Sequence, residues 1–297
     1  MKILYLSNTT TRYWPRLHKG FPSVDYVADG LLHGLKSKHS SDVTDVPYKP
    51  YMYKSSDINK LDLYGRGFTI TKTLDDDESD RNNIEEKIKS KFFDCVIYGS
   101  IHRNRDYFDL VTQVYNKDKI ALIDGEDDTF LDYSLIDKGV YFKRELLDDS
   151  KKLFPISLAF PLEKIQNTNK NKTQAISKNL PSAGGDTWIW TDENDYYSDY
   201  NKSFFGHTWK KGGWESYRHY EIIFSYCYPL FKSLESCPPR CLTTLPKEDL
   251  INIMKHVDRE YKVDESFYYE QMDKLFSYAQ KHLTTTALAN YVLEQIT

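Results

Sequence analysis

The sequence is poor in features that would by themselves place a protein in a class. It has no surplus of positive charge: 40 Lys and Arg stand against 44 Asp and Glu, and the net charge of −4 argues against non-specific binding to nucleic acid. It also has no long apolar run. The one in the opening MKILYLSNTT is too short for a signal or membrane segment and is typical of a first β-strand. We therefore expect a cytoplasmic protein without a membrane span.

Cysteine is scarce as well. Two of the four cysteines form a C-x3-C pair, but no nearby pair of His or Cys could complete a zinc site with them. We expect free thiols in a reducing compartment. The four are Cys95, Cys227, Cys237 and Cys241.

What is present is a globular composition, with 40 % hydrophobic and 28 % charged residues. The length of 297 residues suits two domains of about 150 residues each. We predict an N-terminal domain over residues 1–150 and a C-terminal domain over residues 151–297. We find no internal repeat.

Short apolar runs alternate with amphipathic segments in the first half of the chain. This alternation predicts an α/β fold, with a parallel sheet flanked by helices in a Rossmann-like domain. The acidic run 75–80 is typical of a solvated loop. The predicted strands are 2–7, 42–46, 93–98, 119–123 and 140–142, and the predicted helices are 24–38, 84–91 and 106–116.

The second half repeats this alternation and ends in helices. We predict a second Rossmann-like domain, with C-terminal helices that cross back to the first. A polar stretch rich in Asn and Lys, 166–178, reads as a loop. The predicted strands are 155–161, 186–191, 204–209 and 229–231, and the predicted helices are 193–202, 214–226, 247–256, 264–282 and 284–295.

The stretch KKGGWESYRHYE, residues 210–221, joins a basic glycine turn to a predicted helix. Backbone N–H groups at a helix N-terminus favour an anion, and the two lysines add positive charge there. Arg218 and Glu221 lie at i and i+3 on one face, where an arginine can grip a phosphate and a carboxylate can accept two sugar hydroxyls. This pattern indicates a nucleotide or nucleotide-sugar site. The alternative is an ordinary Arg–Glu pair on a helix surface.

The segment GGWESYRHYEI followed by YPLF resembles the donor-binding segment of glycosyltransferases with the GT-B fold. LYGRGFT (63–69), YGSIHR (98–103), LIDGEDD (122–128) and YFKREL (141–146) fit the same resemblance, which spans about residues 1–250. It implies two Rossmann-like domains that face each other across a cleft. It also implies an enzyme that moves a sugar from a nucleotide-sugar donor to a hydroxyl acceptor.

By this resemblance, Glu221 matches the acid that holds the donor ribose, and Arg218 and His219 lie near the pyrophosphate. The sequence departs from many members, which carry two glutamates separated by seven residues, because position 213 is glycine. How the sugar is held is therefore left open. In a functional interpretation, Lys143 or Arg144 reaches the donor phosphates across the cleft; in a structural one they are hinge charges. The predicted donor-binding residues are Lys143, Arg144, Lys210, Lys211, Gly212, Gly213, Trp214, Arg218, His219 and Glu221.

The N-terminal domain should supply the acceptor site and a general base, because ligands of parallel sheets bind at the carboxyl ends of strands. The candidates are Asp25, His102 and Asp124, in no order. Each has a structural alternative: a helix cap for Asp25, a loop residue bonded to backbone for His102 and a solvated turn for Asp124. His18, after the first strand, is a further polar group at this edge.

The acids of DGEDD could instead bind a divalent metal, as in the single-domain GT-A glycosyltransferases. We expect no metal and no other cofactor, since the lysines, the arginine and the helix dipole already provide for the phosphates. We favour a UDP-linked donor, an inverting course and a glycan or glycoconjugate acceptor. The alternatives are a non-catalytic nucleotide- or glycan-binding protein and a DNA-base glycosyltransferase of the same fold.

Overall fold

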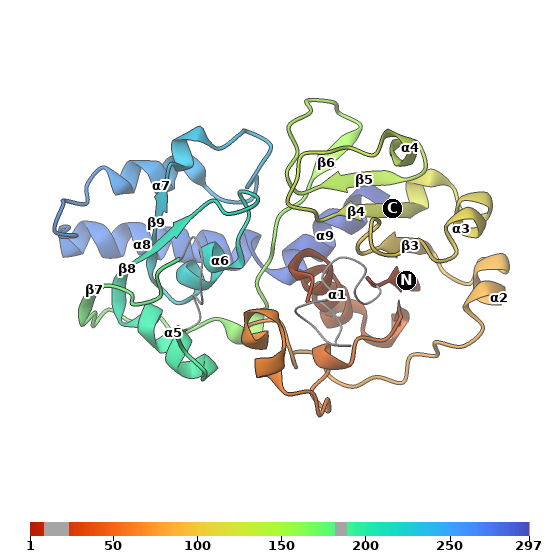
Figure 1. The fold of residues 1–297 in the computed structure, drawn as a ribbon, viewed down its shortest axis with the longest axis horizontal. Coiled ribbons are helices and arrows are strands. Elements are labelled where there is room, and N and C mark those ends of the chain that lie inside the picture. The colour runs from red at the N-terminus through yellow and green to blue at the C-terminus, as the bar shows by residue number, and fades with distance from the viewer. Residues whose placement is uncertain (9–23, 182–188, 297) are drawn as a thin grey trace.

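The computed structural model describes residues 1–8, 24–181 and 189–296. These residues form two parallel β-sheets, each with its own helices, in two lobes (Figure 1). The first lobe contains a six-stranded sheet and the second lobe a three-stranded sheet. The predicted α/β fold class is thereby confirmed.

The six-stranded sheet is parallel throughout. Its central strands are continuous apolar runs, which suits a sheet that is covered on both faces. The strand order changes direction between β1 and β3, and ligands of open α/β sheets bind at the carboxyl ends of strands at such a point. In order across the sheet, the strands are β2 (Val43–Val46), β1 (Ile3–Leu6), β3 (Cys95–Tyr98), β4 (Ile120–Asp124), β5 (Val140–Lys143) and β6 (Leu153–Pro155).

The helices of the first lobe follow the apolar periodicity of the sequence. The longest of them buries Leu31, Leu32 and Leu35, and its N-terminus is capped by Asp25, whose carboxylate accepts a hydrogen bond from the Ala28 N–H. The helices are α1 (Tyr26–His39), α2 (Ile84–Lys89), α3 (Phe108–Val114), α4 (Tyr133–Ile136) and α9 (Thr285–Ile296).

The second lobe is built around a parallel sheet in the order β7-β8-β9. The strands are β7 (Gln174–Ile176), β8 (Ser203–Trp209) and β9 (Tyr228–Lys232). The helices are α5 (Glu193–Asn201), α6 (Tyr217–Phe224), α7 (Lys247–Met254) and α8 (Glu265–His282).

The chain returns to the first lobe at its end, as expected from the sequence. Helix α8 belongs to the second lobe, and α9 packs against α1 of the first lobe (Figure 1). The contact is close: a Cβ atom at Gly34 of α1 would lie 1.9 Å from the Thr285 carbonyl oxygen. Phe160, in the connection between the lobes, forms a parallel bridge with Thr284. The last helix thus ties the two lobes together.

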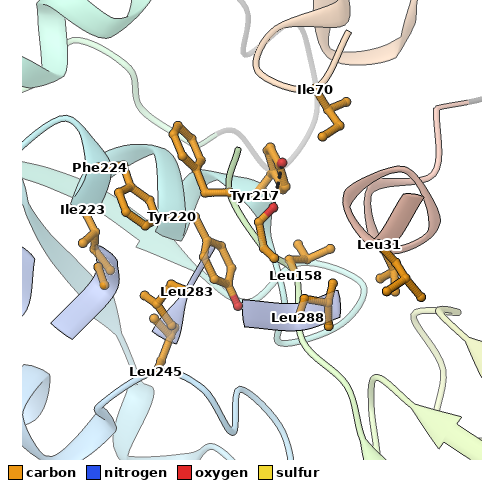
Figure 2. Close-up of a cluster of buried hydrophobic side chains, with 14 of the residues drawn as sticks. Leu31, Ile70, Leu158, Tyr217, Tyr220, Ile223, Phe224, Leu245, Leu283 and Leu288 are labelled. Carbon is orange, nitrogen blue, oxygen red and sulfur yellow. Dashed lines mark hydrogen bonds between the residues drawn. The ribbon is translucent and has the colours of Figure 1, made fainter. Parts of the chain in front are cut away.

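One apolar cluster runs through both lobes. Figure 2 shows Leu31 of α1 and Leu288 of α9 in the same cluster as Tyr217 and Phe224 of α6. A second cluster, which includes Leu4, lies within the first lobe. The lobes therefore share a continuous core. Strand β6 and helix α9 belong to the first lobe, although both come from residues 151–297, and the division at residue 150 stays a prediction.

Most of the predicted elements are present with ends shifted by a few residues. The predicted strand 155–161 is wrong, because only Pro155 belongs to a strand, β6, and the rest of that apolar segment is buried in the connection between the lobes. Strand β7 lies within the polar stretch 166–178, for which the sequence predicts a loop. The predicted helix over 214–226 begins three residues later, at Tyr217. Residues 186–188 of the predicted strand 186–191 lie outside the described residues, and 189–191 do not belong to a strand.

The acidic run 75–80 is a largely exposed loop, as predicted, and Asp77 is the exception. Asp77 is largely buried and pairs with both Lys36 of α1 and Arg81. These cations also pair with the buried Asp45 of β2. The run is therefore held against the edge of the sheet by a shared network of charges.

Candidate functional site

A cluster of polar side chains lies where β3, β4 and β5 end. Asp124, the last residue of β4, is buried, and its carboxylate accepts a hydrogen bond from the Tyr141 hydroxyl at 2.6 Å. The His102 Nε2 lies 3.0 Å from the same oxygen, and the Lys143 Nζ lies 3.0 Å from the other. The register of the sheet places Asp124 directly beside Lys143. Two of the three predicted base candidates, His102 and Asp124, therefore lie together.

The electrostatics of this cluster give Asp124 and His102 different roles. Burial alone would raise the pKa of Asp124, but the hydrogen bond from His102 and the charge of Lys143 outweigh it, and the pKa lies below its ordinary value. Asp124 is thus an ionised, enclosed carboxylate. Because it can only accept, the facing Nε2 of His102 carries the hydrogen and Nδ1 is left to accept a proton. The His102 side chain is 22 % exposed, whereas that of Asp124 is fully buried.

The third candidate, Asp25, has a structural role. Its carboxylate caps α1 and also lies 3.4 Å from the Arg103 guanidinium. Asp25 is therefore the N-cap of α1, which is the structural alternative given for it. His18 lies outside the described residues.

The acidic loop after β4 is paired with cations. Each of its acids faces a basic side chain, so this is not a simple solvated turn. Within the described residues, no group of three or more His, Cys, Asp or Glu side chains is arranged to hold a metal ion. Besides Asp124, the pairs are Glu126 with Arg103, Asp127 with Arg144, and Asp128 with Lys143.

The basic loop, residues 210–216, follows β8 and faces the first lobe. Its two lysines are exposed, and the Lys210 Nζ lies 5.3 Å from the centre of the Trp214 ring. The partial loss of hydration at Lys211, together with repulsion from Arg218, lowers the pKa of the Lys211 ammonium. Lys211 is therefore close enough to Arg218 for their charges to interact, and a role of these cations in donor binding stays a prediction.

The two glycines of this loop let its backbone approach the first lobe. A Cβ atom at Gly213 would lie 2.3 Å from a carboxylate oxygen of Glu145, and one at Gly212 would lie 3.0 Å from Asp127. The same Glu145 oxygen accepts a hydrogen bond from the Glu215 N–H at 3.2 Å. The glycines therefore have a structural reason that the sequence did not reveal. That these glycines also let the backbone approach a diphosphate stays a prediction.

Arg218 and Glu221 are both buried on α6, so the alternative of an ordinary surface pair is wrong. The Arg218 guanidinium donates to the Asn179 carbonyl oxygen at 2.8 Å. The Glu221 carboxylate accepts hydrogen bonds from the Tyr196 hydroxyl at 2.5 Å and the Thr69 hydroxyl at 2.7 Å. Burial raises the pKa of Glu221, although these hydrogen bonds and the Arg218 charge oppose the rise.

His219 is engaged inside the second lobe. Its ring nitrogens lie 2.7 Å from the Thr208 hydroxyl and 2.9 Å from the Trp214 carbonyl oxygen. Burial lowers the pKa of His219 to about 4, so the ring is neutral near pH 7. It fastens the basic loop to α6 and β8.

Lys143 and Arg144 lie on the first lobe, next to the basic loop. Lys143 is fully buried against Asp124, and Arg144 is largely buried and pairs with Asp127. Both cations therefore already have carboxylate partners. That Lys143 or Arg144 contacts the donor phosphates stays a prediction.

Sequence reasoning missed four polar residues of this region: Thr69, Tyr141, Tyr196 and Glu215. Glu215 is buried, and burial raises its pKa to about 7. Its carboxylate accepts a hydrogen bond from the Tyr220 hydroxyl at 2.8 Å. Tyr141 precedes Lys143 by two residues on β5, so the alternation of a strand could have placed it beside Asp124. Thr69 lies outside the strands, so no alternation of this kind could have placed it beside Glu221.

No protein-family model matches this chain, and no curated protein is similar to it. Among the described residues, none of the helices is long and apolar enough to cross a membrane. All four cysteines are free thiols, and three of them are buried.

Proposed function

We propose that this protein is a glycosyltransferase that moves a sugar from a nucleotide-sugar donor, preferably UDP-linked, to a hydroxyl of a glycan or glycoconjugate. In this proposal the two lobes are the two Rossmann-like domains of a GT-B arrangement. The first lobe binds the acceptor and the second binds the donor. The reaction needs no metal and inverts the anomeric centre.

The observation that carries the proposal is the meeting of two strand ends. The loop after β8 contacts the segments that follow β4 and β5, through Gly212 with Asp127 and Gly213 with Glu145. The carboxyl ends of both sheets therefore face the same region, and these are the edges at which parallel sheets bind ligands. The proposed proton acceptor, His102, lies at one edge, and the lysines proposed to bind the donor phosphates, Lys210 and Lys211, follow a strand of the other.

The side chains have definite roles in this reaction. His102 takes the proton of the acceptor hydroxyl as the acceptor oxygen forms a bond to the donor C1 and the bond from C1 to the diphosphate oxygen breaks. Asp124 holds the imidazole in position and stabilises the charge that it acquires. The nucleoside diphosphate leaves with the bonding electrons, and Lys210, Lys211 and Arg218 stabilise its negative charge.

The donor class is tested by a thermal-shift screen against UDP-, GDP-, CMP- and dTDP-sugars. A ligand that binds only the native state raises the melting temperature by mass action, by an amount that depends on its concentration relative to Kd. We expect the UDP-sugars to give the largest shift. A screen in which none of these ligands shifts the melting temperature would contradict the proposal.

The catalytic role is tested by release of UDP from the donor, with and without acceptors. His102→Gln should lower turnover by about 10²–10⁴-fold, the usual contribution of a general base, and leave donor binding unchanged. His256→Gln, at an exposed histidine of the second lobe, is the matched control. Turnover should persist in EDTA. Loss of turnover in EDTA that Mn²⁺ restores would contradict the metal-independent mechanism, and tight binding without turnover would indicate a non-catalytic protein.

A further inference from the structure

A strained segment of the first lobe, residues 64–72, lies between the two lobes. It follows η3 (Lys60–Asp62), includes η4 (Tyr64–Gly67), and belongs to the orange part of the chain at the lower centre of Figure 1. Three of its non-glycine residues have a positive φ: 55° at Arg66, 73° at Thr69 and 54° at Lys72. For a β-branched residue such as Thr69, this conformation is a true outlier, so the backbone is strained there.

Two glutamates and a tyrosine of the second lobe hold Thr69 in this conformation; the tyrosine is Tyr197, whose hydroxyl forms a hydrogen bond with that of Thr69. The Thr69 N–H donates to the Glu193 carboxylate at 2.6 Å, and the Thr69 hydroxyl donates to Glu221 at 2.7 Å. Glu193 also pairs with Lys60 at 3.0 Å, so it grips the segment at a second point. Thr69 is completely buried. These contacts form a latch between the lobes, defined here as Lys60 and Thr69 on one side and Glu193 and Glu221 on the other.

The latch engages Glu221, the carboxylate that holds the donor ribose according to the resemblance to GT-B glycosyltransferases on which the proposed function draws. Glu221 is only 3 % exposed, and the hydroxyl of Thr69 donates to it as a ribose hydroxyl would. The Tyr196 hydroxyl, on the other Glu221 oxygen, comes from the same lobe as Glu221 and moves with it. Of these two donors, only Thr69 comes from the opposite lobe.

We propose that this latch is autoinhibitory, with the Thr69 hydroxyl in the place of a donor ribose hydroxyl on Glu221. The inference rests on the proposed function, because it takes Glu221 as the ribose-binding acid. A nucleotide binds to the open form, and its hydroxyl replaces that of Thr69. Since the ligand binds only the open fraction of molecules, its apparent Kd is raised by the latch.

The test compares Thr69→Val with wild type for binding of UDP by isothermal titration calorimetry. Valine keeps the shape of threonine but cannot donate to Glu221. We expect Kd to fall about tenfold, which corresponds to about 1.4 kcal/mol, the lower end of what a hydrogen bond to a charged group contributes. Thr73→Val is the matched control, because the Thr73 hydroxyl donates to the Ile70 carbonyl oxygen of its own segment. It should leave Kd unchanged.

Other outcomes overturn the latch. An unchanged or raised Kd in Thr69→Val, with UDP binding in wild type, overturns the latch but leaves the donor site in place. Absence of UDP binding in both proteins overturns the proposed UDP site and the latch with it. A second measurement uses wild type alone: hydrogen exchange at the amides of residues 64–72 should become faster when UDP is added. Unchanged or slower exchange there would also overturn the latch.

Discussion

The buried carboxyl of Glu215 makes a quantitative prediction about stability and pH. Its pKa is about 7 in the folded protein, because of burial, against an ordinary value of 4.5. The folded state thus keeps a proton that the unfolded state releases between these two values. The free energy of unfolding should therefore fall as pH rises through this window. One pKa unit corresponds to about 1.4 kcal/mol, so the difference between 4.5 and about 7 corresponds to about 3 kcal/mol.

The assay is urea unfolding at a series of pH values from 4.5 to 8.5. Glu215→Gln removes the titration and keeps an oxygen for the Tyr220 hydroxyl. Relative to wild type, this variant should gain about 3 kcal/mol between the two ends of the series, because it lacks the loss of stability that ionisation of Glu215 causes. Glu235→Gln, at an exposed carboxyl, is the control and should follow wild type. Parallel curves for wild type and Glu215→Gln would refute the reasoning.

Two further predictions concern packing and a buried charge, and urea unfolding checks both. Gly34→Ala should lower the free energy of unfolding by about 1–3 kcal/mol through its contact with Thr285. Gly30→Ala, on the same helix but with its nearest atom at 3.5 Å, should raise it by up to about 1 kcal/mol; equal effects would contradict the packing of α9 on α1. Lys143→Met leaves Asp124 buried without its ammonium and should cost about 3–5 kcal/mol. Adding Asp124→Asn should recover part of this loss, and a fully stable single variant would contradict the buried pair.

Several strands of the first sheet, such as β1 and β3, could be predicted because they are apolar runs bounded by polar residues. Strand β7 could not, because its three residues, Gln174–Ile176, lie in a polar segment and owe their conformation to pairing with β8. The opposite error occurs at the apolar segment 155–161, for which the sequence predicts a strand that the structure does not contain. Its burial comes from the connection between the lobes, and a periodicity of apolar residues does not distinguish this from a strand.

Part of the candidate site could also be predicted. His102 and Asp124 each follow or end a strand of one parallel sheet, so their proximity follows from the rule that such ends share an edge. The contact of Thr69 with Glu221 joins residues 152 positions apart in different lobes, and no local pattern encodes it. Gly213 and Glu145, which also lie close together, are far apart in the sequence as well. Contacts of this kind depend on how the lobes meet, which a single sequence does not specify.

The way in which the lobes meet gives the glycines and the lysines of the basic loop different roles from those that the sequence predicts. Glu145 and Asp127 of the first lobe lie against the glycine backbone, so the glycine side of the loop faces carboxylates that would repel a diphosphate. Lys210 and Lys211 are exposed and face no carboxylate within the ion pairs of the described residues. In the proposed function, an anionic donor would therefore meet the lysines first. Gly213 would serve to set the loop against the first lobe, and would contribute to donor binding only through the position that it gives to these two cations.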